Sequence, residues 1–179
     1  ARVLELDPED AAALSALAEL RAGQGRSAEA VQLLQRWLAI ETDPQRRLVL
    51  HHGIAEALET QVKDVDQAAL AYRALLEEFP DDAKAVVALE SIYERLGRWN
   101  ELEQSLRDRL PQLADPDQRT DVRLKLARLS EQRLGKPALA LEQLREVLAD
   151  APAHAGAAAE FERLLRATGA HAELASYLE

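Results

Sequence analysis

The chain has 179 residues, of which 47% are apolar and only 4% are aromatic, and Ala and Leu supply most of the apolar share. Because these are strong helix formers, while Gly and Pro number only seven each, the composition predicts an all-α fold and argues against strands. Asp and Glu total 32 against 22 Lys and Arg, a formal net charge of −10. Such a chain repels phosphate groups and anionic lipid, so we expect no nucleic-acid partner.

The compartment is only weakly indicated. The chain has no Cys, so disulfides and thiolate metal sites are excluded and redox chemistry cannot distinguish the cytoplasm, which we favour, from the periplasm. No uncharged run approaches the ~20 apolar residues of a membrane span, so we expect no membrane insertion. The N-terminal ARVLELDPED lacks a signal-peptide pattern, and we expect the sequence to begin inside a longer protein. The Ala-rich, Arg-rich and Lys-poor composition is associated with bacteria of GC-rich genome.

An internal repeat is the strongest feature of the sequence. A shift of 72 residues places Pro8 on Pro80 and Pro152, and Pro44 on Pro116. The same shift superposes many apolar positions, among them Leu17, Leu89 and Phe161; Leu20, Ile92 and Leu164; and Leu34, Leu106 and Leu178. The chain therefore contains about two and a half copies of one unit.

Each copy divides at an Asp-Pro step, since Asp caps a helix and Pro suits its first turn. Asp7 and Asp82 are also predicted to cap helices. The spacing predicts helices over 10–23, 27–41, 45–61, 66–78, 82–96, 99–113, 117–134, 137–149, 154–168 and 171–179. These form helix pairs over 10–44, 45–82, 83–116 and 117–154, with an incomplete pair over 155–179, all in a single array over 1–179. Residues 1–8 are predicted to end a preceding pair.

The first pair carries a recognisable pattern of small and apolar residues. Leu14, Leu17 and Ala18 lie on one helix, Ala30 and Leu34 lie on the next, and glycines separate the two. This layout resembles the tetratricopeptide repeat (TPR) family. The resemblance implies an α-solenoid, a right-handed superhelix of about five antiparallel helix pairs. The sequence departs from the family where Leu14, Arg21 and Leu34 replace aromatic residues, and in about four extra residues in the second and fourth pairs.

A search for catalytic chemistry yields nothing. His51 and His52 are adjacent, so on a helix their side chains diverge by ~100° and cannot share one metal ion; we expect an ordinary surface or turn role for each. The glycines end helices and do not form a phosphate loop or nucleotide fingerprint. Trp37 and Trp99 are expected to pack in the core, Trp99 between neighbouring pairs. We therefore predict no enzyme activity, no metal and no cofactor.

A partner is expected on the first helices of the pairs, which a stacked array leaves exposed on its concave wall. Projection of the repeat places there Ser15, Glu19, His52, Glu56, Lys84, Ser91, Arg95, Leu124, Arg128, Arg163 and Arg166. From this set, His52, Lys84, Arg95, Arg128, Arg163 and Arg166 are the predicted partner-binding residues. The basic members suit an acidic peptide or a C-terminal carboxylate. The alternative is a solvated face whose charges pair with Glu94, Glu131 and Glu162.

The sequence thus predicts a non-catalytic scaffold that binds a protein or peptide, or that assembles into a larger complex. Two other functions stay open: a helical-repeat nucleic-acid-binding module, and a regulatory or targeting segment of a larger enzyme. Exposed apolar faces at the ends of the array are expected to permit self-association.

Overall fold

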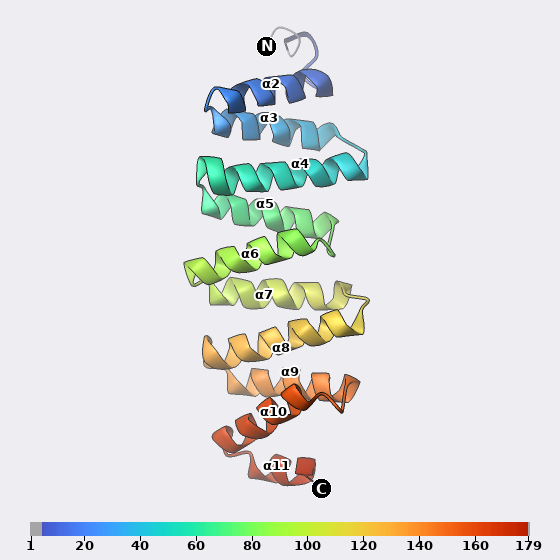
Figure 1. The fold of residues 1–179 in the computed structure, drawn as a ribbon, viewed down its shortest axis with the longest axis vertical. Helices are drawn as coiled ribbons and strands as arrows, with labels where there is room; N and C mark the ends of the chain where they lie inside the picture. The colour runs from blue at the N-terminus through green and yellow to red at the C-terminus, as the bar shows by residue number, and fades with distance from the viewer. Residues whose placement is uncertain (1–4, 179) are drawn as a thin grey trace. The chain divides into compact units, whose positions relative to one another are not determined.

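The computed structural model describes residues 5–178. Within them the chain forms helices only (Figure 1): α2 (Ala11–Gly23), α3 (Ser27–Ile40), α4 (Pro44–Ala57), α5 (Val65–Glu78), α6 (Ala83–Leu96), α7 (Trp99–Arg109), α8 (Pro116–Gln132), α9 (Pro137–Asp150), α10 (Ala155–Thr168) and α11 (His171–Leu178). A π-helical turn, Leu58–Val62, extends α4, and a 3-10 turn, Leu110–Gln112, extends α7. The predicted all-α fold and the predicted helices are confirmed, apart from these two turns and Glu179, which lies outside the described residues.

The chain divides into two compact units, residues 1–92 and 93–179, and the division falls within α6. In the first unit, α2 packs on α3, α3 on α4, and α4 on α5. In the second, α7 packs on α8, α8 on α9, α9 on α10, and α10 on α11. Successive helices run antiparallel in each unit, the arrangement of an α-solenoid (Figure 1). The single array over 1–179 stays a prediction, as does the preceding pair, since residues 1–4 lie outside the described part.

Side-chain caps explain where the helices begin. The Asp43 carboxylate accepts a hydrogen bond from the Arg46 backbone N–H at 2.8 Å, and Asp115 accepts one from that of Asp117 at 2.9 Å. Pro44 and Pro116 occupy the first turn of α4 and α8, as the Asp-Pro pattern predicts.

The predicted capping role of Asp7 is wrong. Asp7 accepts a hydrogen bond from the Glu9 backbone N–H in the preceding turn, at 3.1 Å, while Asp10 caps α2 through the N–H of Ala13 at 2.8 Å. The repeat predicts Asp10 as the cap, because the 72-residue shift places Asp10, not Asp7, on the capping residue Asp82.

Three glycines at one position of the repeat end helices. Gly25, Gly97 and Gly169 have φ of 74°, 65° and 72°, the left-handed conformation that closes a helix and that glycine adopts without steric cost. Each therefore turns the chain from a first helix into a second helix.

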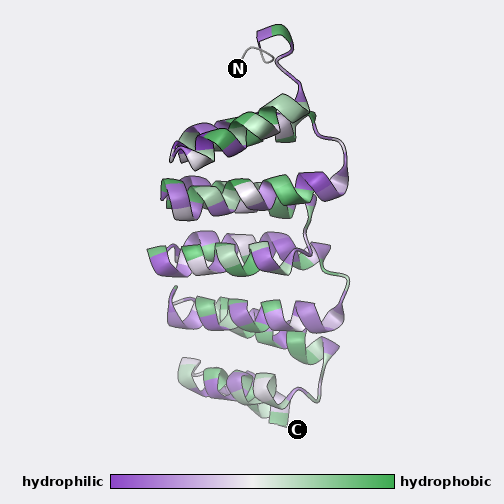
Figure 2. Ribbon diagram, turned by 45° about the horizontal axis from the view of Figure 1, so that its top comes forward, coloured by the Kyte–Doolittle hydropathy of each residue, from purple (hydrophilic) through white to green (hydrophobic). Residues whose placement is uncertain are grey.

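Each unit has its own apolar core. Leu14 and Ala18 of α2 are buried against Leu33 of α3, with Trp37 partly buried beside them. The second unit buries Leu144, Phe161 and Leu165 in a cluster that joins α8, α9 and α10. Figure 2 shows hydrophobic and hydrophilic residues along the helices, the composition of helices that bury one face and expose another. Within residues 5–178, no helix combines the length and the apolar character needed to cross a membrane.

Candidate partner-binding surface

The predicted basic residues of the first unit have partners within the chain. The Lys84 ammonium of α6 forms an ion pair with Glu56 of α4. His52 Nε2 lies 3.0 Å from Asp82 Oδ2, and because Nε2 faces a carboxylate it is the donor. Both contacts join α4 to the beginning of α6. Arg95, on the last turn of α6, already belongs to the second unit; it is exposed and also interacts within the chain.

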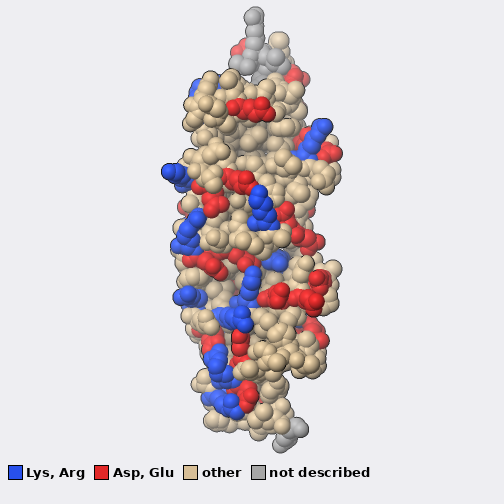
Figure 3. Space-filling model, in the orientation of Figure 1, with Lys and Arg blue, Asp and Glu red and all other residues tan. Residues whose placement is uncertain are grey.

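The second unit shows the same arrangement between α8 and α10. The Arg128 guanidinium binds Glu160 Oε1 at 3.0 and 2.9 Å, and Arg163 forms a fork with the two Glu131 oxygens at 2.8 and 2.6 Å. The hydrogen bond from Arg163 lowers the pKa of Glu131. Arg166 pairs with Glu162 one turn earlier in α10. Around α8 and α10, Figure 3 accordingly shows basic side chains next to acidic ones.

Two of the acidic partners that the sequence offered are therefore present, Glu131 and Glu162. Surface ion pairs contribute only about 0–1 kcal/mol each, so a stronger ligand could exchange with them. Leu124 departs from its predicted place on the exposed wall: it is buried in the core cluster of the second unit.

His51 has a structural role that the sequence analysis did not foresee. Its side chain is buried, not on the surface as expected, with Nε2 3.2 Å from Glu78 Oε2 and its ring edge-on to Phe79. Arg47 donates two hydrogen bonds to the same carboxylate, from Nε at 2.5 Å and from Nη2 at 2.6 Å. These contacts, chiefly the hydrogen bond from Arg47, lower the pKa of Glu78 to about 2. The contacts of Arg47 and His51 with Glu78 thus connect α4 to the end of α5.

The repeat contained a signal for this contact. The 72-residue shift places His51 on Arg123 and Glu78 on Asp150, and Arg123 binds Asp150 at 2.5 Å in the second unit. A basic group thus faces an acidic group at this register in both units.

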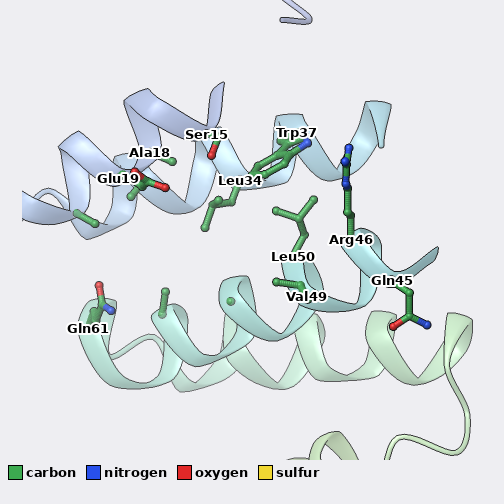
Figure 4. Close-up of a pocket in the computed structure, with 14 residues that line it drawn as sticks. Ser15, Ala18, Glu19, Leu34, Trp37, Gln45, Arg46, Val49, Leu50 and Gln61 are labelled. Atoms are coloured by element: carbon green, nitrogen blue, oxygen red, sulfur yellow. The ribbon is translucent and has the colours of Figure 1, made fainter. Parts of the chain in front are cut away.

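The first unit also contains an apolar groove of about 640 Å³ between α2 and α4, with α3 as its floor (Figure 4). Leu34 and Trp37 of α3 are half-buried and point toward Val49 and Leu50 of α4. The large apolar side chain of Val49 is 70% exposed. Over this part of the molecule, most of the face in Figure 3 is uncharged.

Small side chains keep the groove open. Ala18, Ala30 and Ala57 line it, and so does Gly53, where an added Cβ would meet no atom within 4 Å. No hydrogen bond or ion pair joins α2 to α4 among the described residues, in contrast to the pairs that join α4 to α6. The Trp37 ring is held in place because its Nε1 donates to Glu41 at 3.2 Å.

Only part of this surface was predicted from the sequence. Ser15 and Glu19, which the repeat placed on the exposed wall, line the groove. Trp37 packs beside the core as predicted, but its other side faces the groove. Val49 and Gly53 were missed; an apolar residue on the exposed side of a helix and a glycine in its middle were the available signals.

Trp99 is half-buried at the start of α7, and the Arg133 guanidinium lies over its ring, 4.9 Å from the centroid. It therefore joins α7 to the end of α8, the contact between neighbouring pairs that was predicted. Among residues 5–178, no group of three or more His, Asp or Glu side chains is placed to hold a metal ion.

The antiparallel pairs and the exposed first helices define a helical-repeat protein of the kind that binds other proteins. Sequences of the family described as "Tetratricopeptide repeat" match residues 1–50, 52–82 and 85–120, and together these matches cover more than half of the chain. The chain belongs to the tetratricopeptide repeat family. The TPR fold is in general a non-catalytic scaffold for protein interactions, which supports that class of function for this chain.

Two solved structures of MamA share this fold, and a third solved structure is similar in sequence over most of its length. A crystal structure of MamA protein is 13% identical, with 96% of this chain and 89% of that chain covered and a TM-score of 0.50. MamA AMB-1 is 18% identical over 96% of this chain and 90% of that chain, also with a TM-score of 0.50. TTC0263, a thermophilic TPR protein of Thermus thermophilus, is 23% identical over 92% and 86%, with a TM-score of 0.44. Among curated proteins, none has a sequence that matches significantly.

Proposed function

We infer that this chain is a scaffold that holds a partner protein by a short segment laid in the groove between α2 and α4. The observation that carries this proposal is the groove itself, an uncovered apolar surface on the first helices. Its volume of about 640 Å³ lies within the roughly 300–1,000 Å³ of ligand pockets. Covering exposed apolar side chains gains about 25 cal/mol per Å², so a partner segment is favoured where Val49 and Trp37 face solvent.

A peptide-display library selected on the chain tests this proposal. Val49→Gln removes an exposed apolar contact without disturbing the core, and we expect the selected peptides to bind this variant roughly tenfold more weakly. Leu70→Gln is the matched control, because Leu70 is a 54% exposed leucine on α5 of the same unit. Selected peptides that lose affinity for the Leu70 variant instead, or for neither variant, would contradict the proposal.

An acidic partner on Lys84, Arg95, Arg128, Arg163, Arg166 and His52 stays a separate prediction. Its carboxylates would have to replace those that already pair with at least five of these six residues, at the modest cost of surface ion pairs. The triple variant Arg128→Glu, Arg163→Glu and Arg166→Glu is expected to abolish capture of an acidic peptide from solution. Unchanged capture by a variant whose circular dichroism remains helical would rule out this surface.

A further inference from the structure

We propose that the groove between α2 and α4 takes a segment with large apolar side chains and a neighbouring Lys or Arg, whose cation pairs with Glu19. This inference rests on the proposed scaffold function and names the chemistry of the partner segment.

Glu19 is the first reason. It is exposed, lines the groove, and makes no hydrogen bond or ion pair with its side chain among the described residues. Several acidic residues at other places on the first helices are paired within the chain, as Glu56 is with Lys84 and Glu131 is with Arg163. The Glu19 carboxylate is therefore available to a cation from outside the chain.

The other charge of the groove is offset within the chain. Arg46 lies toward the opposite end from Glu19 (Figure 4), 71% exposed, with its Nη1 3.7 Å from Glu41 Oε2. The backbone N–H groups of Asp43 and Thr42 also donate to Glu41 and lower its pKa, so Glu41 stays ionised opposite Arg46. The Glu19 carboxylate therefore makes the groove favour a cationic partner. The net charge of −10 also favours a cation.

The apolar side chains of the partner segment are inferred from the apolar residues that line the groove. Trp37, Leu34 and Val49 lie together between Glu19 and Arg46 in Figure 4, so an apolar side chain that covers them places its neighbour within reach of Glu19. The surface beside Gly53 is open to such a side chain, since even a Cβ added at Gly53 would meet no atom within 4 Å.

Other occupants are less well matched. An acidic segment would bring like charge to Glu19. A second copy of the chain would carry its own charge of −10 toward the first, which opposes association.

Three fluorescently labelled peptides of equal length test the proposal, with one apolar core and flanking Lys, Gln or Glu. Their anisotropy is titrated with the wild type, with Glu19→Lys, and with Glu77→Lys as matched control, since Glu77 is an exposed carboxylate on α5 of the same unit. Trp37 emission in a Trp99→Phe background reports whether the groove is covered, because the chain has only two Trp. Gly53→Leu fills the groove and should block peptide binding there. If the Gly53→Leu variant does not fold, Val49→Gln is used instead.

We expect the Lys peptide to bind wild type most tightly and to shift Trp37 emission to the blue. Glu19→Lys should weaken the Lys peptide about threefold to tenfold, the size of a surface ion pair exchanged for repulsion. Glu77→Lys should leave it unchanged.

Equal binding of all three peptides, lost with Gly53→Leu, would overturn the charge proposal and leave the scaffold function standing. Preference for the Glu peptide, or equal effects of Glu19→Lys and Glu77→Lys, would also overturn it. Self-association of the chain with no peptide binding would overturn both proposals.

Discussion

Lys63 follows the π-helical turn with a φ of 61°, the left-handed conformation that side chains other than Gly adopt at a cost. The 72-residue shift places Lys63 on Gly135, whose φ is 63°. The two residues occupy the same turn of the repeat, between a long first helix and the second helix of the pair. Exchanging Lys and Gly at the two positions therefore measures the cost of this φ for a side chain.

Lys63→Gly is expected to raise the free energy of unfolding by about 1 kcal/mol, because Gly removes the steric strain at this φ. Gly135→Lys should lower it by a similar amount. Urea unfolding followed by circular dichroism measures both changes. A loss of stability in Lys63→Gly would mean that contacts of the Lys63 side chain outweigh the strain.

Single residues could be predicted from sequence where the cause is local. Asp43 and Pro44 start a helix through contacts within four residues, and Gly97 ends one through its own φ. His51 needed more, since its burial depends on Glu78 and Phe79 of another helix. Comparison with Arg123 and Asp150 in the next copy would have revealed that contact.

At the scale of elements, the link between α4 and α5 has a definite pH dependence. The pKa of Glu78 is about 2 in the folded chain, against an ordinary value of 4.5. A carboxylate with a depressed folded pKa contributes stability above its unfolded pKa and loses that contribution as the pH falls through the folded value. The link is therefore complete above about pH 4.5 and weakens toward about pH 2.

Glu78→Gln should lower the free energy of unfolding at pH 7, measured with urea, by an amount on the order of 1 kcal/mol after allowance for solvent screening. The difference from wild type should shrink as the pH falls from about 4.5 toward about 2. Glu77→Gln is the control, because Glu77 is the exposed carboxylate next to Glu78 in the same helix. A difference that stays constant down to the lowest pH would show that the charge of Glu78 is not the cause.

Element positions followed from the repeat, but the form of two helix ends did not. The extra residues of the second pair were expected in a longer first helix and its turn; in the structure this segment ends in the π-helical turn Leu58–Val62. A π turn depends on one additional residue between hydrogen-bonded groups, and the spacing of apolar side chains does not fix it.

At the scale of the whole molecule, repetition predicted the stack of helix pairs, because each pair needs a neighbour to bury its remaining face. The location of a binding surface was harder to derive. Basic residues on the first helices were conspicuous in the sequence, yet most of them pair with carboxylates on neighbouring helices or turns. The groove requires α2, α3 and α4 together, and its opening depends on how three separate segments leave space between them.

The measurement that tests the scaffold claim most directly is a map of backbone amide chemical shifts of the chain upon titration with a display-selected peptide. A partner segment in the groove should cause the largest changes at Ser15, Glu19, Val49 and Gly53, on the two helices that border the groove. Changes confined to α5, or to α8 and α10 of the second unit, with these four amides unmoved, would contradict it.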